Sequence, residues 1–181
     1  MTEMNNGYKL EDDEKITPII VYTAGGVTRG DAISKKPIRV NTWLRTPSAP
    51  DYFHLLNARM MLVVGGSPNS GLAFKEYYLP TCDILAYHLV PPATEPLDYD
   101  ESELNRKMEP VTIMVSTFRI NGQLRISGQT TLGKHIEINH ESFSSIYNVE
   151  ITNPILPTLP PIRAPLLLLR PGKVSFALKG Q

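Results

Sequence analysis

Residues 111–126, VTIMVSTFRINGQLRI, constrain the fold more than any other stretch of the chain. Apolar and polar side chains alternate on either side of Ser116-Thr117, which is the period of a β-strand with one buried face. A turn at these two residues aligns Val115 with Phe118 and leaves one face of both strands apolar. We therefore predict a β-hairpin that turns at Ser116-Thr117.

The dipeptide Asn121-Gly122 lies inside the second strand of this hairpin. It is usually the strongest short signal for a hairpin turn, but a turn there would mix apolar and polar side chains on one face. Gly122 is then a mid-strand glycine, which permits a sharp bend or a close approach of another backbone. We predict a structural role for Gly122.

A weaker copy of the hairpin occurs earlier in the chain. The Ala24-Gly25 turn lies 92 residues before Ser116-Thr117, and Gly30 lies 92 residues before Gly122. Two later pairs of segments recur at a spacing of about 90 residues, which predicts an internal duplication. Gly30 is accordingly the second predicted structural glycine.

The repeat divides the chain into four segments. Residues 1–15 form an acidic flexible arm, 16–90 a first unit, 91–109 an acidic linker that contains proline, and 110–181 a second unit. Short apolar runs between glycines and prolines predict about five strands in each unit, and no long window has convincing helical periodicity. The predicted fold class is all-β, with two tandem units that are small and barrel-like.

The second strand of each hairpin has the form apolar-x-Gly-x-apolar, as in Ile120-Asn121-Gly122-Gln123-Leu124. This arrangement resembles the Sm-like and SH3-like small-barrel folds, including domains of uncharacterised bacterial proteins. The resemblance implies two small barrels that close their own edges. The Asp-x-x-Met-Asn type loop of the Sm family is absent after Ile126, so the resemblance does not carry that family's RNA binding to this chain.

Positive and negative charges are equal in number, eighteen of each, but they are unevenly distributed. The arm and the linker hold eleven of the acids and four of the bases, which leaves seven acids and fourteen bases in the two units. Acidic connectors are commonly just solvated chain. The alternative is that the basic units face an anionic partner and that the acidic segments screen them.

No set of residues has the spacing of a catalytic or metal site, so we predict neither enzyme activity nor a cofactor. The four histidines lack nearby Cys or Glu at ligand spacing, and residues 135–140, HIEINH, are predicted to form a strand. Cys82 is the single cysteine and is predicted to be a small buried side chain in a strand.

The most suggestive local feature is the segment 35–45, KKPIRVNTWLR, in which basic residues surround the single tryptophan. Cations neutralise phosphates and an aromatic ring stacks on bases, as single-stranded nucleic acid requires. The same residues also suit a protein partner or an ordinary surface and core. The candidate binding residues are Lys35, Lys36, Arg39, Trp43 and Arg45.

Because the sequence contains no recognisable set of catalytic or metal-binding residues, we predict that the protein acts by binding rather than by catalysis. The sequence predicts a non-enzymatic protein-interaction or scaffold module that self-associates or joins a larger complex, without a small-molecule substrate. RNA or single-stranded DNA binding through residues 35–45 is the alternative. The polar, acidic N-terminus and the short apolar runs predict a cytoplasmic location without membrane insertion.

Overall fold

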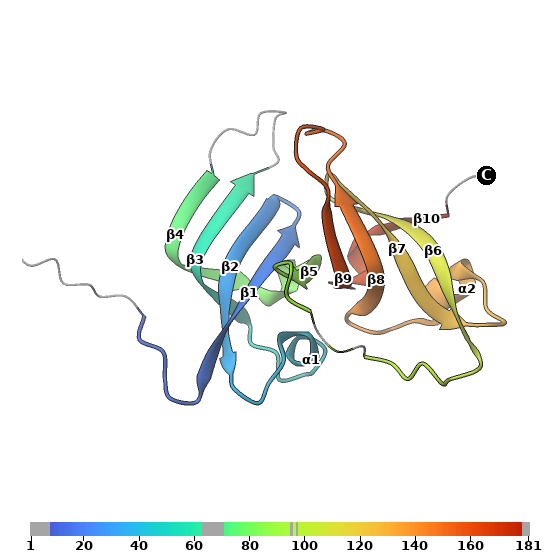
Figure 1. Cartoon of the computed structure of the whole chain (residues 1–181), viewed down its shortest axis with the longest axis horizontal. Helices are drawn as coiled ribbons and strands as arrows, with labels where there is room; N and C mark the ends of the chain where they lie inside the picture. The colour runs from blue at the N-terminus through green and yellow to red at the C-terminus, as the bar shows by residue number, and fades with distance from the viewer. Residues whose placement is uncertain (1–7, 63–70, 95, 97, 179–181) are drawn as a thin grey trace, which may run out of the picture.

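The computed structural model describes residues 8–62, 71–94, 96 and 98–178, and it confirms the all-β prediction (Figure 1). Ten strands form one antiparallel sheet, with two short α-helices and two 3-10 turns in the connections. The strands are β1 Glu14–Thr23, β2 Gly26–Lys35, β3 Tyr52–Leu62, β4 Gly71–Pro80, β5 Ala86–Leu89, β6 Arg106–Val115, β7 Phe118–Ser127, β8 Ser144–Thr152, β9 Ile162–Leu169 and β10 Ser175–Ala177. The helices are α1 Val40–Leu44 and α2 Leu132–Ile138, and the 3-10 turns are η1 Thr81–Asp83 and η2 Pro171–Lys173.

The sheet has the order β10-β6-β7-β8-β9-β5-β1-β2-β3-β4. It is open, with β10 at one edge and β4 at the other, so the predicted pair of closed barrels is not confirmed. The first five strands and the last five, here called the first half and the second half, each follow the element order β-β-α-β-β-3-10-β. The halves join where Ala86 and Tyr87 of β5 pair with Leu169 and Leu168 of β9.

The hairpin predicted from parity is confirmed. Val115 pairs with Phe118, and the register continues to Val111 opposite Gly122. Ser116 adopts a positive φ of 54°, which matches the turn geometry favoured between right-twisted strands. In the first half, Thr23 pairs with Gly26, so that hairpin turns at Ala24-Gly25 as predicted.

Both predicted structural glycines lie at breaks in the strand register. The register shifts around Gly30 between β2 and β3, and around Gly122 between β7 and β8. Asn57 on β3 and Asn148 on β8 each have a φ of 50°. A Cβ atom on Gly122 would lie 2.6 Å from Cγ2 of Ile146, so any side chain there would force its neighbours to shift.

Two local predictions are wrong. Residues 135–138 belong to α2 rather than to a strand, because Thr131 caps a helix by accepting a hydrogen bond from the backbone N–H of Lys134. Cys82 is exposed in η1 rather than buried in a strand. In addition, β6 begins at Arg106, so the last four residues of the predicted linker are part of a strand.

Two apolar cores lie on opposite faces of the sheet, and the central strands contribute to both. Ile19 and Val21 of β1 join the core of the first half, whereas Ile20 and Tyr22 join the core of the second half. Successive residues of a strand point to opposite faces. β9 behaves in the same way, because Leu168 enters the first core and Leu167 enters the second. Both strands are therefore continuous apolar runs, as expected where both faces are covered.

Candidate functional site

The predicted binding residues 35–45 connect the end of β2 to α1. Lys35 is the last residue of β2, and its Nζ lies 2.9 Å from a carboxylate oxygen of Glu11 and 2.8 Å from one of Asp13. Hydrogen bonds to Asp13 and Glu11 raise the pKa of Lys35 above its ordinary value. The acidic arm thus neutralises one of the four cations of this segment. Residues 1–7 of the arm lie outside the described residues.

Trp43 belongs to α1 and is partly buried against the first core. Its ring lies 5.7 Å from that of Phe53, and its indole N–H donates to the carbonyl oxygen of Ser48 at 3.0 Å. Lys36 and Arg39 are exposed. The structure therefore gives Trp43 packing contacts within the protein and leaves these two cations at the surface.

Arg45 follows α1 and contacts the linker between the halves. Its guanidinium lies 2.8 Å from a carboxylate oxygen of Asp98 and also donates to the hydroxyl of Ser145 on β8. The hydroxyls of Ser145 and Tyr147 each donate to Asp98 at 2.5 Å. Burial raises the pKa of Asp98, but these hydrogen bonds and Arg45 outweigh it and hold that pKa below its usual range. Asp98 therefore stays ionised and ties the first half to the second.

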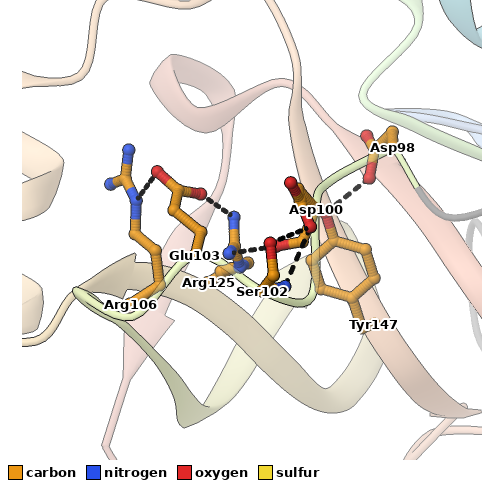
Figure 2. A network of polar contacts seen from close by, with 7 residues as sticks. All are labelled: Asp98, Asp100, Ser102, Glu103, Arg106, Arg125 and Tyr147. Atoms are coloured by element: carbon orange, nitrogen blue, oxygen red, sulfur yellow. Dashed lines mark hydrogen bonds and ion pairs between the residues drawn. The ribbon is translucent and has the colours of Figure 1, made fainter.

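Arg125 on β7 is the centre of a second group of contacts with the linker (Figure 2). Its Nη1 donates to Glu103 at 2.7 Å, and its Nη2 donates to the carbonyl oxygen of Asp100 at 2.8 Å. The guanidinium carbon also lies 4.4 Å from the centre of the Tyr99 ring. Only 13% of the Arg125 side chain is exposed. This is the geometry of a cation enclosed by an acidic and aromatic segment.

Arg106, the first residue of β6, extends the same network. Its Nε donates to Glu103 at 3.2 Å, on the other oxygen from the one that Arg125 binds (Figure 2). Hydrogen bonds from the two arginines hold the pKa of Glu103 below its usual range. One linker carboxylate therefore bridges two neighbouring strands.

An open cleft of about 280 Å³ adjoins these contacts. Arg45, Arg106 and Arg125 line it together with Asp98 and Tyr99 of the linker. His135 of α2 and Asn139, the residue that follows α2, also line it. Burial lowers the pKa of His135, Glu141 opposes this shift, and Arg106 adds to it. We call this site, with its three arginines, the cationic cleft.

Of the residues predicted from the sequence, only Arg45 lies in the cationic cleft. Sequence reasoning missed Asp98 of the linker. It also missed Arg106 of β6, Arg125 of β7 and Tyr147 of β8. The excess of bases in the two halves and of acids in the linker was the available signal. This charge distribution indicated that the linker is attracted to the two halves, but it did not indicate which residues form the contacts.

The second feature of interest is β4, at the edge of the sheet. Within the part of the chain that the structure describes, no strand pairs with its outer edge. Leu72 and Phe74 are each 38% exposed, and Tyr78 is 54% exposed. The Tyr78 ring stacks on that of His54 at 4.3 Å, and its hydroxyl donates to Glu76 at 2.9 Å. β4 thus presents free backbone groups together with apolar and aromatic side chains.

The structure was also searched for metal sites and membrane-spanning helices, and the chain was compared with known proteins. The described residues contain no group of three or more His, Cys, Asp or Glu side chains placed to hold a metal ion. Among the same residues, no helix has the length and apolar character needed to cross a membrane. Comparisons with protein-family models, with curated proteins and with solved structures find no match to this chain.

Proposed function

We propose that the protein is a non-enzymatic protein-interaction module that binds an extended segment of a partner along β4. In this proposal the chain is a duplication of a five-stranded small-barrel unit, and the second copy of the unit covers the first at β5. The edge of the sheet that remains open is then the surface for a partner. The observation that carries the proposal is the uncovered ten-residue edge strand with exposed apolar side chains.

Natural proteins protect the edges of their sheets because unpaired N–H and C=O groups pair readily with other chains. At the opposite edge, β10 is three residues long and pairs with residues 112–114 of β6. The part of β6 beyond β10 carries Lys107 and Pro110, which are residues that protect an edge. β4 is ten residues long, and its protecting residues are Lys75 near its centre and Pro80 at its end. A long open edge beside exposed aromatic rings suits the addition of a peptide strand, in which the main chain gives affinity and side-chain pockets give specificity.

The duplication is supported by details that recur at equivalent places. The side-chain amide of Asn57 donates to Asp31, next to Gly30, at 3.0 Å. The side-chain amide of Asn148 likewise donates to Gln123, next to Gly122, at 3.1 Å. Both asparagines have the same left-handed φ at a register shift. Such β-bulges are specific structural features of a sheet rather than irregularities in its pairing.

A peptide-display selection against the full chain tests the proposal. We expect selected peptides to alternate apolar and polar residues, because they bind as strands. Two methylated versions of each peptide are compared, one with N-methyl groups on the odd-numbered residues and one with them on the even-numbered residues. One version should not bind and the other should bind normally, because only alternate N–H groups of an added strand point to the sheet. Peptides whose binding is unaffected in both versions would refute strand addition.

Two variants locate the surface. Phe74→Lys should abolish binding of the selected peptides, whereas Ile155→Lys should not, because Ile155 is 52% exposed in the loop between β8 and β9 and is not part of β4. Light scattering on the same variants measures self-association, with the mass of one chain being 20.2 kDa. A multiple of this mass that returns to one chain in Phe74→Lys identifies the bound segment as β4 of a second copy. Equal effects of both variants would overturn the assignment to β4.

A further inference from the structure

The linker is bound to the protein like a peptide ligand. Asp98, Tyr99, Asp100 and Glu103 all contact groups of the two halves, although the segment contains no helix or strand. Side-chain carboxylates meet arginines at both ends of the segment, and the backbone carbonyl of Asp100 meets Arg125 in the middle. The segment is bent rather than extended, because the backbone N–H of Glu103 donates to the carbonyl oxygen of Asp100 and the backbone N–H of Ser102 donates to the Asp100 side chain. An acidic and aromatic peptide that forms a turn is therefore the chemistry that this surface recognises.

Arg125 depends on the linker for its contacts. Among the described residues, its ion pair, hydrogen bonds and ring contact are all with residues 99–103. When the connector leaves, Arg125 loses these contacts and is left without a carboxylate partner among the described residues. Arg45 and Arg106 also lose their ion pairs in that event.

The part of the linker around Glu103 is held weakly, whereas Asp98 is only 18% exposed and is held by Arg45, Ser145 and Tyr147. Ion pairs with exposed members contribute about 0–1 kcal/mol each, and the Glu103 side chain is 46% exposed in its pairs with both arginines. The linker is retained because it is tethered, which gives it an effective concentration on the order of millimolar. A partner segment that makes additional contacts can replace it.

The cleft offers such contacts. Its open volume of about 280 Å³ is lined beyond the linker by His135 on α2, by Asn139 just after α2 and by Ser144 on β8. These side chains are donors or acceptors of hydrogen bonds. A longer acidic segment would reach them while its carboxylates take the positions of Asp98 and Glu103.

We propose that the cationic cleft is a binding site for an acidic peptide segment of a partner protein, and that linker residues 98–103 occupy it as an intramolecular competitor. The site is separate from β4 and does not rest on the function proposed above. Release of the linker is the step that opens the site, and the acidic character of the linker sets how readily it is released.

The probe is a labelled peptide that copies residues 96–104, PLDYDESEL, and its binding to the full chain is measured by fluorescence anisotropy. We expect weak binding to the wild type, because the tethered copy fills the cleft. Glu103→Gln should increase the affinity for the free peptide, and the double variant Asp98→Asn/Glu103→Gln should increase it on the order of tenfold or more. Added salt should weaken this binding.

Two controls make the result specific. The amide peptide PLNYNQSQL should not bind, and adding Arg125→Gln to the double variant should abolish binding of the acidic peptide. Melting curves establish whether each variant is folded. If the double variant does not fold, the affinity of Glu103→Gln for the acidic peptide is the test. Folded variants that bind the acidic peptide no better than the wild type, or that bind both peptides equally, would overturn the proposal.

Discussion

β4 and β9 are the fourth strands of their halves, yet they have different surroundings. β9 pairs with β8 on one side and with β5 on the other, and its residues 166–169 are all leucine and all buried. Among the described residues, β4 pairs with β3 alone, and most of its residues are exposed, with Lys75 and Glu76 at its centre. The same place in the repeated element order is thus central in the second half and peripheral in the first.

The contrast shows that position in the whole sheet, more than position in the unit, determines strand composition. A strand covered on both faces and both edges has no place for a charge, because an unpaired buried charge is strongly unfavourable. An edge strand keeps charges as protection against uncontrolled pairing. β4 keeps two charged residues and three large exposed hydrophobic ones, Leu72, Phe74 and Tyr78, which are the side chains that the proposed strand addition would use.

The largest expected difference between the strands comes from leucine truncation. Leu167 on β9 is fully buried, so Leu167→Ala should lower the free energy of unfolding by about 2–5 kcal/mol. Leu72→Ala on β4 removes an exposed side chain and should change it by about 0.5 kcal/mol or less. Urea denaturation of both variants measures this. Similar losses would mean that β4 is covered in solution.

The bulge glycines give a second comparison. A Cβ on Gly122 would lie 2.6 Å from Ile146 and 2.9 Å from Val149, so Gly122→Ala should destabilise the protein by about 1–3 kcal/mol. The nearest atom to a Cβ on Gly30 is Cβ of Leu55 at 3.1 Å, so Gly30→Ala should cost less. Thermal unfolding of the two variants ranks them. The reverse order would contradict the closer packing at the second bulge.

Arg170 and Arg163 compare a cation at the joint with one on the surface. Arg170 donates to the carbonyl oxygens of Ile84 and Thr81 at 3.0 and 2.9 Å and so connects the halves. Arg170→Gln should lower stability by about 1–2 kcal/mol. Arg163 is 80% exposed in its pair with Glu150, so Arg163→Gln should have an effect below about 0.5 kcal/mol. Chemical denaturation measures the free energy of unfolding of both variants. Equal losses would mean that Arg170 does not stabilise the contact between the halves.

The smallest expected effect is a dependence on pH at the same joint. His88 on β5 is buried beside the Tyr22 hydroxyl, and burial lowers its pKa against an opposing hydrogen bond to the carbonyl oxygen of Leu89. The unfolded chain therefore takes up a proton first as pH falls below about 6.5, and the folded state loses stability progressively as pH falls further.

His88→Gln is the variant that identifies the source of this pH dependence. Its free energy of unfolding should vary less between pH 7.5 and 5.5 than that of the wild type. An unchanged slope would assign the pH dependence to other groups.

Local patterns predicted much of the fold because they depend on neighbouring residues. The parity of residues 111–126 gave the hairpin register, and the repeated glycines marked both bulges. Residues 132–138 were missed because the alternation of HIEI competes with the helix cap at Thr131, and a seven-residue helix shows little periodicity. The pairing of β5 with β9 is set by long-range packing, although the run of four leucines is typical of a strand covered on both faces.

The candidate sites were less predictable. Residues 35–45 are close in sequence, which made them conspicuous, but Lys35 and Arg45 bind carboxylates and Trp43 packs on Phe53. The cationic cleft combines Arg45 with Arg125 and a linker carboxylate far along the chain. Charge counts indicated that the acidic segments oppose the basic halves, but only the folded chain shows which partners meet.

The position of β1 between two cores has a consequence for synthesis. β1 leaves the ribosome before the other strands of the sheet, and its second face is covered by Phe118 and by β9, which are made much later. At about 5–20 residues per second, this cover arrives on the order of 10 s after β1 itself. Until then the nascent chain exposes Ile20 and Tyr22, so the final folding step waits for the last strands, and both halves reach the native state together.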